Sequence, residues 1–376
     1  MTKGTGLTYA GTGVDYGIMD PHKRDSMRAA LETDHWVERF GFKILSWTRG
    51  ESVTLLETPW GYLGLVIEGL GTKNLVADAL YALAASMESV LGRSYYDHVG
   101  QCNAAMAFND AITLGAMPIM YGQYLALGSP KWLENEDRRR DLIAGTKKAC
   151  DLARCSWVGG ETPTLMGVIV SSSVDLAGGT VGWIPDKRRL INPANIVLGD
   201  AIVIIESSGI HANGLTLARK IADSLPIGYL TPLSDGRPYG EALLDPTHIY
   251  VCLVEDCFEY GLDIHYAVNV TGHGWRKLMR ANRSFTYVID TLPTQLPIFD
   301  FIQEHGPVDD REAYGNLNMG AGFALYVPAG NVSKVILLAK ELGQRAFLAG
   351  QVEAGEKQVV IRPKGLTYKA DTLAVR

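Results

Sequence analysis

Four short segments of this chain combine glycine with charged or hydrogen-bonding side chains, and these residues have the clearest chemistry. They span residues 68–73, 159–162, 207–214 and 271–274. Glycine adopts backbone angles closed to other residues and lets main-chain N–H groups approach a ligand closely. Such N–H groups attract anions, as helix N-termini do. The four segments together therefore indicate a phosphate-rich ligand.

The first segment reads Glu-Gly-Leu-Gly-Thr-Lys and follows an apolar run. Gly69, Gly71 and Thr72 offer main-chain N–H groups to a phosphate. Lys73 adds a positive charge and is the candidate phosphate clamp. The spacing is not that of a Walker A loop, GxxxxGK[ST]. A tight turn that carries a solvated lysine explains the same residues and stays open as an alternative.

Three carboxylates stand in or near these segments: Glu68, Asp110 and Glu161. With the amide of Asn109 they offer oxygen ligands of the kind that Mg²⁺ prefers. A helix cap or a surface charge also explains each carboxylate taken alone.

Two histidines and one cysteine are further candidates. His211 and His273 lie beside glycines rather than on apolar helix faces, which favours contact with a ligand. A turn histidine bonded to the backbone is the alternative. Cys102 precedes a helical run, where a thiol could be reactive, although a buried inert thiol fits the same position.

The elements that must position these residues follow from the apolar pattern. Strands are predicted at 62–67, 117–127, 168–176, 200–205, 265–270 and 322–327, and helices at 76–91, 103–114, 135–153, 215–223, 275–282 and 332–342. This order predicts an α/β (α+β) fold with two domains. The charged, proline-bracketed stretch 184–193 marks the boundary, so the predicted domains are 1–186 and 187–376. Each glycine segment follows a strand, so we expect the four to converge at one ligand site.

Composition excludes several classes of protein. The 376 residues are 47% hydrophobic and 20% charged, as in ordinary globular proteins. A net charge of −6 argues against a nucleic-acid binder. No apolar run is long enough to cross a bilayer, which argues against a membrane protein. The five cysteines include no CxxC pair, so neither a zinc site nor a disulfide framework is indicated, and we expect a cytoplasmic protein.

The same segments, in the same order, resemble the aminoimidazole ribonucleotide synthetase family. The matching motifs are collinear over nearly the whole chain: EGLGTK at 68–73, ND at 109–110, GGET at 159–162, SSGIHANG at 207–214, DPTHIYV at 245–251, TGHG at 271–274 and NMGAG at 318–322. The resemblance implies ATP-dependent ring closure of formylglycinamidine ribonucleotide in purine biosynthesis, with ATP and Mg²⁺ as cofactors. It also implies a homodimer in which N-terminal strands of two subunits form a shared barrel.

Carried onto this sequence, the resemblance gives the candidate residues roles. Lys73, His211 and His273 are the predicted catalytic residues. Glu68, Asp110 and Glu161 are the predicted Mg²⁺ ligands. Predicted nucleotide contacts are Gly69, Gly71, Thr72, Asn109, Gly160, Thr162 and Asn213, and predicted substrate contacts are Ser208, Asn269, Thr271, Gly272 and Gly274.

Five positions depart from the family pattern. The family usually has Asp at Glu68 and Cys102, His at Asn269, Gly at His273 and Glu at Thr164. Asn103 or Asp97 would have to compensate for the carboxylate missing at Cys102. His273 is a candidate to replace the proton-transfer group missing at Asn269.

These departures leave two alternatives open. One is another ATP-using enzyme of the superfamily, similar to selenophosphate synthetases, thiamine monophosphate kinases or hydrogenase-maturation dehydratases. The other is a non-catalytic nucleotide-binding paralogue.

Overall fold

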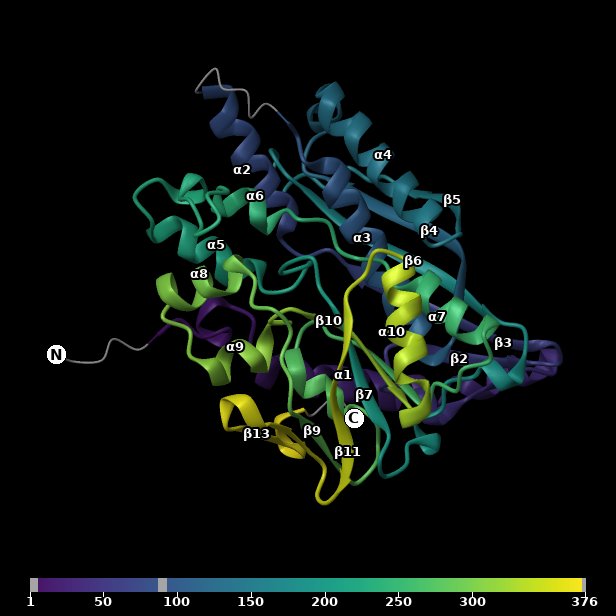
Figure 1. The fold of residues 1–376 in the computed structure, drawn as a ribbon. Coiled ribbons are helices and arrows are strands. Elements are labelled where there is room, and N and C mark those ends of the chain that lie inside the picture. Colours follow the sequence, from purple (N-terminus) through teal and green to yellow (C-terminus); the bar gives the residue numbers. More distant parts are fainter. Residues whose placement is uncertain (1–5, 87–92, 374–376) are drawn as a thin grey trace.

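The computed structural model describes residues 6–86 and 93–373 as two β-sheets with helices packed against them (Figure 1). The predicted mixed α/β class is confirmed. The first sheet is antiparallel except between β4 and β5. Its strands, in spatial order, are β1 (Lys43–Ile44), β2 (Thr54–Thr58), β3 (Gly61–Gly69), β6 (Val174–Ile184), β4 (Met117–Leu127) and β5 (Ser156–Glu161).

The second sheet comes from the C-terminal half of the chain. It is antiparallel except between β9 and β12. Its strands, in spatial order, are β13 (Leu366–Lys369), β12 (Gln358–Ile361), β9 (Phe285–Ile289), β11 (Ala346–Ala354), β7 (Ala201–Glu206), β10 (Ala321–Val327) and β8 (Tyr266–Asn269).

Ten α-helices are assigned within the described ranges. They are α1 (Tyr16–Leu31), α2 (Lys73–Ser86), α3 (Tyr96–Ala111), α4 (Glu136–Leu152), α5 (Leu215–Ser224), α6 (Tyr239–Leu243), α7 (Val251–Glu259), α8 (Pro297–His305), α9 (Asp310–Asn316) and α10 (Val332–Glu341). A short 3₁₀ helix, η9 (Gly274–Met279), follows β8 and matters for the site. In this described part of the chain, no helix is both long and apolar enough to cross a bilayer.

Helix α3 is the central helix of the fold. Every residue from 99 to 111 is buried, and the polar side chains among them, Gln101, Asn103, Asn109 and Asp110, all form hydrogen bonds. It packs on β3, β6 and β4 of the first sheet and against α4. The contact with α4 requires glycine, because a Cβ at Gly145 would lie 1.9 Å from the Asp97 carbonyl oxygen.

The opposite face of α3 binds an extended segment, residues 244–250, of the C-terminal half. His98 Nδ1 lies 2.9 Å from the Leu244 carbonyl oxygen, and Gln101 donates to the Thr247 carbonyl at 2.9 Å. Asn109 donates to the His248 carbonyl at 2.8 Å and accepts from the Tyr250 N–H at 3.0 Å. One helix face thus satisfies the main chain of this segment and joins the two halves of the molecule.

The N-terminal arm also crosses to the C-terminal half. Tyr9 N–H donates to the Glu312 carboxylate at 2.6 Å, and Tyr9 OH accepts from the Gly214 N–H at 3.2 Å. The sequence-based division assigned this arm to the first domain, residues 1–186, and that boundary stays a prediction.

The structure differs from the predicted elements in several places. The predicted helix 103–114 corresponds to α3, which begins and ends earlier, and the predicted helix 275–282 is the shorter 3₁₀ helix η9. The predicted strand 168–176 is wrong in its start: β6 begins at Val174, and the preceding residues form turns. The predicted turn at 159–162 is largely extended, because Gly159 and Gly160 belong to β5. The predicted helix 76–91 corresponds to α2, and its residues 87–91 lie outside the described residues.

We expect Asn109→Ala to weaken the junction between the two halves. The change leaves the His248 carbonyl and the Tyr250 N–H without the amide that binds them. Two buried main-chain groups without partners should lower the free energy of unfolding by about 2–4 kcal/mol. Urea unfolding followed by circular dichroism measures this, with the exposed Gln351→Ala as the matched control. Equal unfolding midpoints for both variants would contradict the role given to Asn109.

Candidate functional site

A cavity of about 640 Å³ lies where three of the four glycine segments meet. Its wall contains the predicted site residues Glu68, Asp110, Asn213, Thr271, Gly272 and His273. Glu68 lies near the end of β3, Asp110 near the end of α3, and Thr271 to His273 between β8 and η9. Helix α1 closes one side with His22, Lys23 and Ser26.

The cavity holds a close pair of carboxylates. Burial, and then the neighbouring Asp110, raise the pKa of Glu68 to about 8. Asn269 Nδ2 donates to Asp110 Oδ1 at 2.7 Å and fixes that carboxylate. In the described residues no group of three or more His, Cys, Asp or Glu side chains forms a metal site. Two carboxylates still fit Mg²⁺, because this ion commonly binds one or two carboxylates together with phosphate oxygens of a substrate.

Basic side chains face the same cavity, and the sequence analysis did not select them. Lys277 and Arg280 come from η9 and the residue after it, and Lys23 comes from α1. Arg280 donates to the Gly50 carbonyl and to Ser52 Oγ, both at 2.9 Å, and so ties η9 to the loop before β2. The sequence contained one signal for these residues. The predicted helix that directly follows the fourth glycine segment carries three cations, Arg276, Lys277 and Arg280.

His273 is held between α1 and the turn after β8. Its φ is +67°, a left-handed conformation that few non-glycine residues adopt. Its ring stacks on Tyr16 with 3.7 Å between centroids, and Nε2 lies 3.4 Å from Asp20 Oδ2. Burial, with Arg276 and Lys277 nearby, lowers the pKa of His273 to about 3. The imidazole is therefore neutral at physiological pH.

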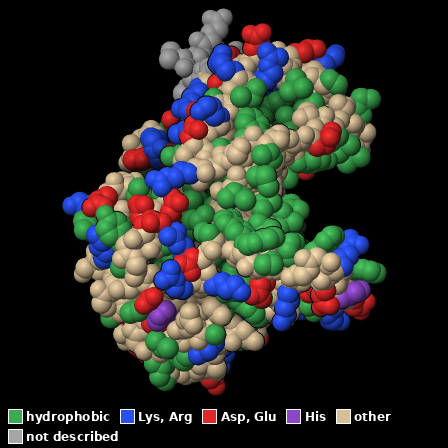
Figure 2. All heavy atoms as spheres, turned by 90° about the vertical axis from the view of Figure 1, so that its right-hand side faces the viewer, with side chains coloured by type: hydrophobic (Ala, Val, Ile, Leu, Met, Phe, Trp, Pro, Cys, Tyr) green, Lys and Arg blue, Asp and Glu red, His purple; other side chains and the backbone are tan. Residues whose placement is uncertain are grey.

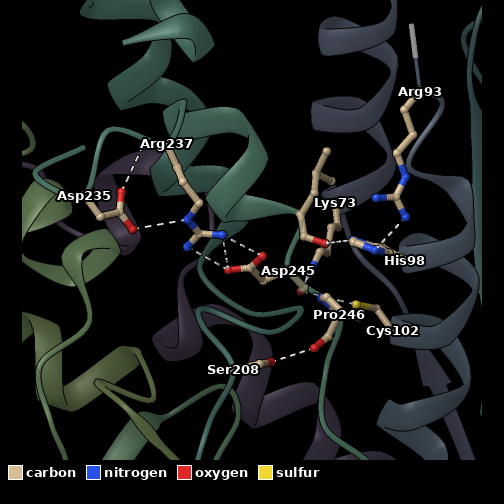
Figure 3. A network of polar contacts seen from close by, with 10 residues as sticks. Lys73, Arg93, His98, Cys102, Ser208, Asp235, Arg237, Asp245 and Pro246 are labelled. Carbon is tan, nitrogen blue, oxygen red and sulfur yellow. Dashed lines mark hydrogen bonds and ion pairs between the residues drawn. The ribbon is translucent and has the colours of Figure 1, made fainter. Parts of the chain in front are cut away.

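Lys73 is fully buried and does not line this cavity. Its ammonium donates to the His211 carbonyl at 2.8 Å and to the Asp245 carbonyl at 2.7 Å. Figure 3 shows Lys73 pointing at the loop of Asp245 and Pro246, with Cys102 beside the same loop. In this chain the ammonium ties the start of α2 to two loops of the C-terminal half.

The segment 207–214 folds back on itself around His211. His211 Nε2 accepts the Ser208 N–H at 3.3 Å, and Ser208 Oγ donates to the Pro246 carbonyl at 2.6 Å. Burial, with His248 and Lys73 nearby, lowers the pKa of His211 well below its usual value. Asn213 differs from both residues, since it lines the cavity and its buried Nδ2 has no hydrogen-bond partner in the described structure.

The predicted nucleotide contacts that precede Lys73, which are Gly69, Gly71 and Thr72, are not among the residues that line the cavity. Gly71 has a φ of +75°, which suits glycine, and the Thr72 hydroxyl is buried without a described partner. Gly69 is exposed at the end of β3. Gly274, after His273, lies against the main chain of residues 314–317, where a Cβ would come within 2.4 Å of the Tyr314 carbonyl oxygen.

The fourth segment is not brought to this cavity. Gly160, Glu161 and Thr162 lie on or next to β5, the edge strand, and all three are exposed. Strands β6 and β4 separate β5 from β3, which carries Glu68. Neighbouring strands are about 4.8 Å apart, so β5 lies about 14 Å from β3.

Two positions that depart from the family pattern, Cys102 and Thr164, and the two candidates to compensate for Cys102, Asn103 and Asp97, have ordinary partners. Cys102 Sγ accepts from the Thr247 N–H and hydroxyl, both at 3.2 Å, on the face of α3 that binds residues 244–250. Asn103 Nδ2 donates to Tyr121 OH at 2.9 Å. Asp97 pairs with Arg93, about 20 Å along α3 from Asp110. Thr164 forms an isolated bridge with Leu127.

Two domain descriptions match the chain. The N-terminal domain of the AIR synthase related proteins matches residues 74–184, and the C-terminal domain of the same proteins matches residues 198–362. Together they cover more than half of the sequence.

Relatives named phosphoribosylformylglycinamidine cyclo-ligase are similar to this chain over most of their length. The protein from Methanocaldococcus jannaschii is 38% identical over 77% of this chain and 78% of its own. The protein from Methanococcus maripaludis strain C6 is 33% identical over 92% of both chains.

Solved structures share the fold at low identity. Thiamine-monophosphate kinase from Stenotrophomonas maltophilia superposes with a TM-score of 0.57 at 20% identity, over 91% of this chain and 96% of that one. A HypE-HypF complex gives a TM-score of 0.58 at 15% identity, over 86% of this chain and 93% of that one.

His273→Asn should make the protein less sensitive to acid. The folded pKa of His273, about 3, lies below the ordinary value of 6.5, so the neutral ring stabilises the folded state above pH 6.5. That contribution is lost as the pH falls from 6.5 toward 3. Asparagine tolerates a positive φ but does not titrate. Melting temperatures from pH 7.5 to 4 should therefore fall less steeply for this variant than for wild type. The exposed His35→Gln is the control, and parallel profiles for wild type and His273→Asn would refute the assignment.

Proposed function

The chain belongs to the AIR synthase related family, and from that membership we propose that it is an ATP-dependent phosphoribosylformylglycinamidine cyclo-ligase of purine biosynthesis. It closes formylglycinamidine ribonucleotide to aminoimidazole ribonucleotide in the cytoplasm. The observation that carries the proposal is the cavity, which gathers Glu68, Asp110 and the turn of Thr271 and Gly272 at one place.

The reaction needs positioning and charge neutralisation more than covalent chemistry from the protein. The substrate amide oxygen takes the γ-phosphoryl group of ATP, an internal nitrogen attacks the same carbon, and phosphate leaves. Glu68 and Asp110 would hold Mg²⁺, which when bound neutralises phosphoryl oxygens. Asn269 keeps Asp110 oriented through its 2.7 Å hydrogen bond.

Asn213 is well suited to donate to the ligand. Its Nδ2 has no partner within the described residues, and the residue forms part of the cavity wall. An unpaired buried donor is costly, so a ligand oxygen that accepts from it gains binding energy. Thr271 and Gly272 offer a hydroxyl and a main-chain N–H beside it. The residues of the edge strand, Gly160, Glu161 and Thr162, could contribute only if a second subunit brought them to the cavity.

The second candidate function is that of another ATP-using enzyme of the same superfamily. Asn269 replaces a histidine of the family and is committed to Asp110, so the proton-transfer group is missing at its usual place. A related fold was solved with the ATP analogue AMPPCP and the ligand TMP. That likeness, at 15% identity and a TM-score of 0.55, concerns the fold alone.

The direct test incubates the protein with ATP, Mg²⁺ and formylglycinamidine ribonucleotide. ADP, phosphate and aminoimidazole ribonucleotide should form in equal amounts. Asp110→Asn keeps the side-chain shape but removes the negative charge, and it should lower kcat/KM by about 10²–10³-fold. The exposed Glu341→Gln is the matched control.

Two results of this assay would contradict the proposal. Wild-type protein that forms no aminoimidazole product fails as a cyclo-ligase, and thiamine monophosphate and selenide then become the substrates to test. An Asp110→Asn variant as active as wild type would refute the carboxylate role.

A homodimer through the first sheet completes the proposal. One face of this sheet packs on α3, while the other exposes apolar side chains. These include Leu65 and Ile67 of β3, which are 58% and 73% exposed, and Met120 of β4 and Val158 of β5. Figure 2 shows hydrophobic side chains gathered around a hollowed surface on this side of the molecule. A patch of this kind marks an interface, and a second copy of the same sheet would close it into a barrel.

Ile67→Lys should prevent this dimer from forming. A charge at the centre of the apolar face is costly to bury without a partner charge. Light scattering after size-exclusion chromatography should give twice the 40.9 kDa chain mass for wild type and the single mass for the variant. Leu337→Lys on α10, at an exposed leucine of another surface, should remain a dimer. A monomeric wild type, or a dimeric Ile67→Lys variant, would count against this interface.

A further inference from the structure

The cavity contains a lysine that no sequence motif indicated. Lys277 is only 7% exposed, yet it forms part of the cavity wall. Its ammonium donates to the Asn269 carbonyl at 3.2 Å and to Thr271 Oγ1. A lysine ammonium has three N–H donors, so these two contacts in the described structure leave one donor for a ligand. Both partners belong to the strand end and turn that the proposed function assigns to the substrate.

The side chain of Lys277 lies among groups that complement an ammonium. Two carboxyl side chains, Asp110 and Glu68, border the same cavity and interact with it electrostatically. A buried charge needs partners of opposite charge or good hydrogen bonds, and the cavity supplies both. A ligand phosphate entering beside it would add a charge-assisted hydrogen bond.

Lys73 offers a useful comparison, because it is also buried and also bonded to two oxygens. Its two partners are main-chain carbonyls of the C-terminal half, and it is absent from the cavity wall. A phosphate could reach Lys73 only after those loops moved. Lys277 needs no such movement, since its side chain already borders the space beside Glu68 and Asp110.

We propose that Lys277 is the lysine that binds a ligand phosphate in this cavity. The inference rests on the proposed function for the identity of the ligands. Two sources share the phosphate chemistry, the triphosphate of ATP and the 5′-phosphate of the ribonucleotide substrate. Lys23 and Arg280 also line the cavity and add positive charge to it.

The experiment compares ligands with and without phosphate by calorimetry in the presence of Mg²⁺. One pair is ATP and adenosine, and the other is formylglycinamidine ribonucleotide and its ribonucleoside. Lys277→Gln keeps hydrogen-bond donors and removes the charge. This variant should bind either ATP or the ribonucleotide about tenfold to a hundredfold more weakly than wild type. Its affinity for the phosphate-free ligand of that pair should be unchanged. The pair that responds identifies the source of the phosphate.

Three further variants complete the design. Lys277→Arg keeps the charge and should keep most of the phosphate affinity that Lys277→Gln loses. Lys73→Gln should lower stability without a selective loss of phosphate affinity, because its partners are main-chain carbonyls. Lys340→Gln, at an exposed lysine of α10, controls for net charge. If Lys277→Gln does not fold, Lys277→Met, which keeps the volume, replaces it, and binding of the phosphate-free ligands confirms an intact cavity.

The outcomes separate this inference from the proposed function. If wild type binds both phosphate ligands but forms no aminoimidazole ribonucleotide, the proposed cyclo-ligase activity is refuted. The role of Lys277 is then decided by the affinities of the Lys277→Gln variant alone. Unchanged phosphate affinity in Lys277→Gln, or an equal loss for phosphate-free ligands, overturns the inference. A selective loss in Lys73→Gln alone overturns it as well. Wild type that binds neither ATP nor the ribonucleotide overturns both.

Discussion

The fold depends on the contact between α3, with the start of α2, and two loops of the C-terminal half. The ammonium of Lys73 and the side chains of Gln101, Cys102 and Asn109 all bond the main chain of this region. Extended segments such as 244–250 carry main-chain groups that burial would otherwise leave unpaired, at a cost for each group. Side chains of α3 satisfy these groups and hold the two halves of the molecule together. Asp110, near the end of the same helix, borders the cavity together with the turn of Thr271.

Charge balance explains how so polar a cavity remains stable. Asp110 and Lys277 lie on the same cavity with Glu68 and Arg280, so the buried ammonium and the Asp110 carboxylate each have a group of opposite sign nearby. The same arrangement suits a ligand that carries both a metal ion and phosphates. The carboxylates would interact with the metal ion, and the basic side chains would interact with the phosphates. Asn269 strengthens the balance by holding Asp110 in place.

The class of fold could be predicted from the sequence, and three of the four glycine segments line one cavity in the structure. Glu68 and Thr271 lie at strand ends, which bring polar residues to one place in α/β proteins, whereas Asp110 comes from the end of helix α3. Local patterns could not predict the surroundings of Lys73, because its carbonyl partners lie 138 and 172 residues further along the chain. For the same reason the segment 159–162 looked like a ligand turn, although pairing with β4 makes it an edge strand. Lys277 was missed because it stands beside Arg276 and near Arg280, and the sequence alone does not tell which of these cations faces the cavity.

The path of the N-terminal arm has a consequence for the order in which the molecule assembles. Helix α1 forms a wall of the cavity, and the arm before it is fastened by Tyr9 to Glu312 of α9. Tyr9 and Glu312 are 303 residues apart in the sequence, so the arm and α1 can take this position only after the segment that carries α9 has been made. The strands of the first sheet all lie before residue 185 and can pair before that point, whereas the α1 side of the cavity is fixed only afterwards.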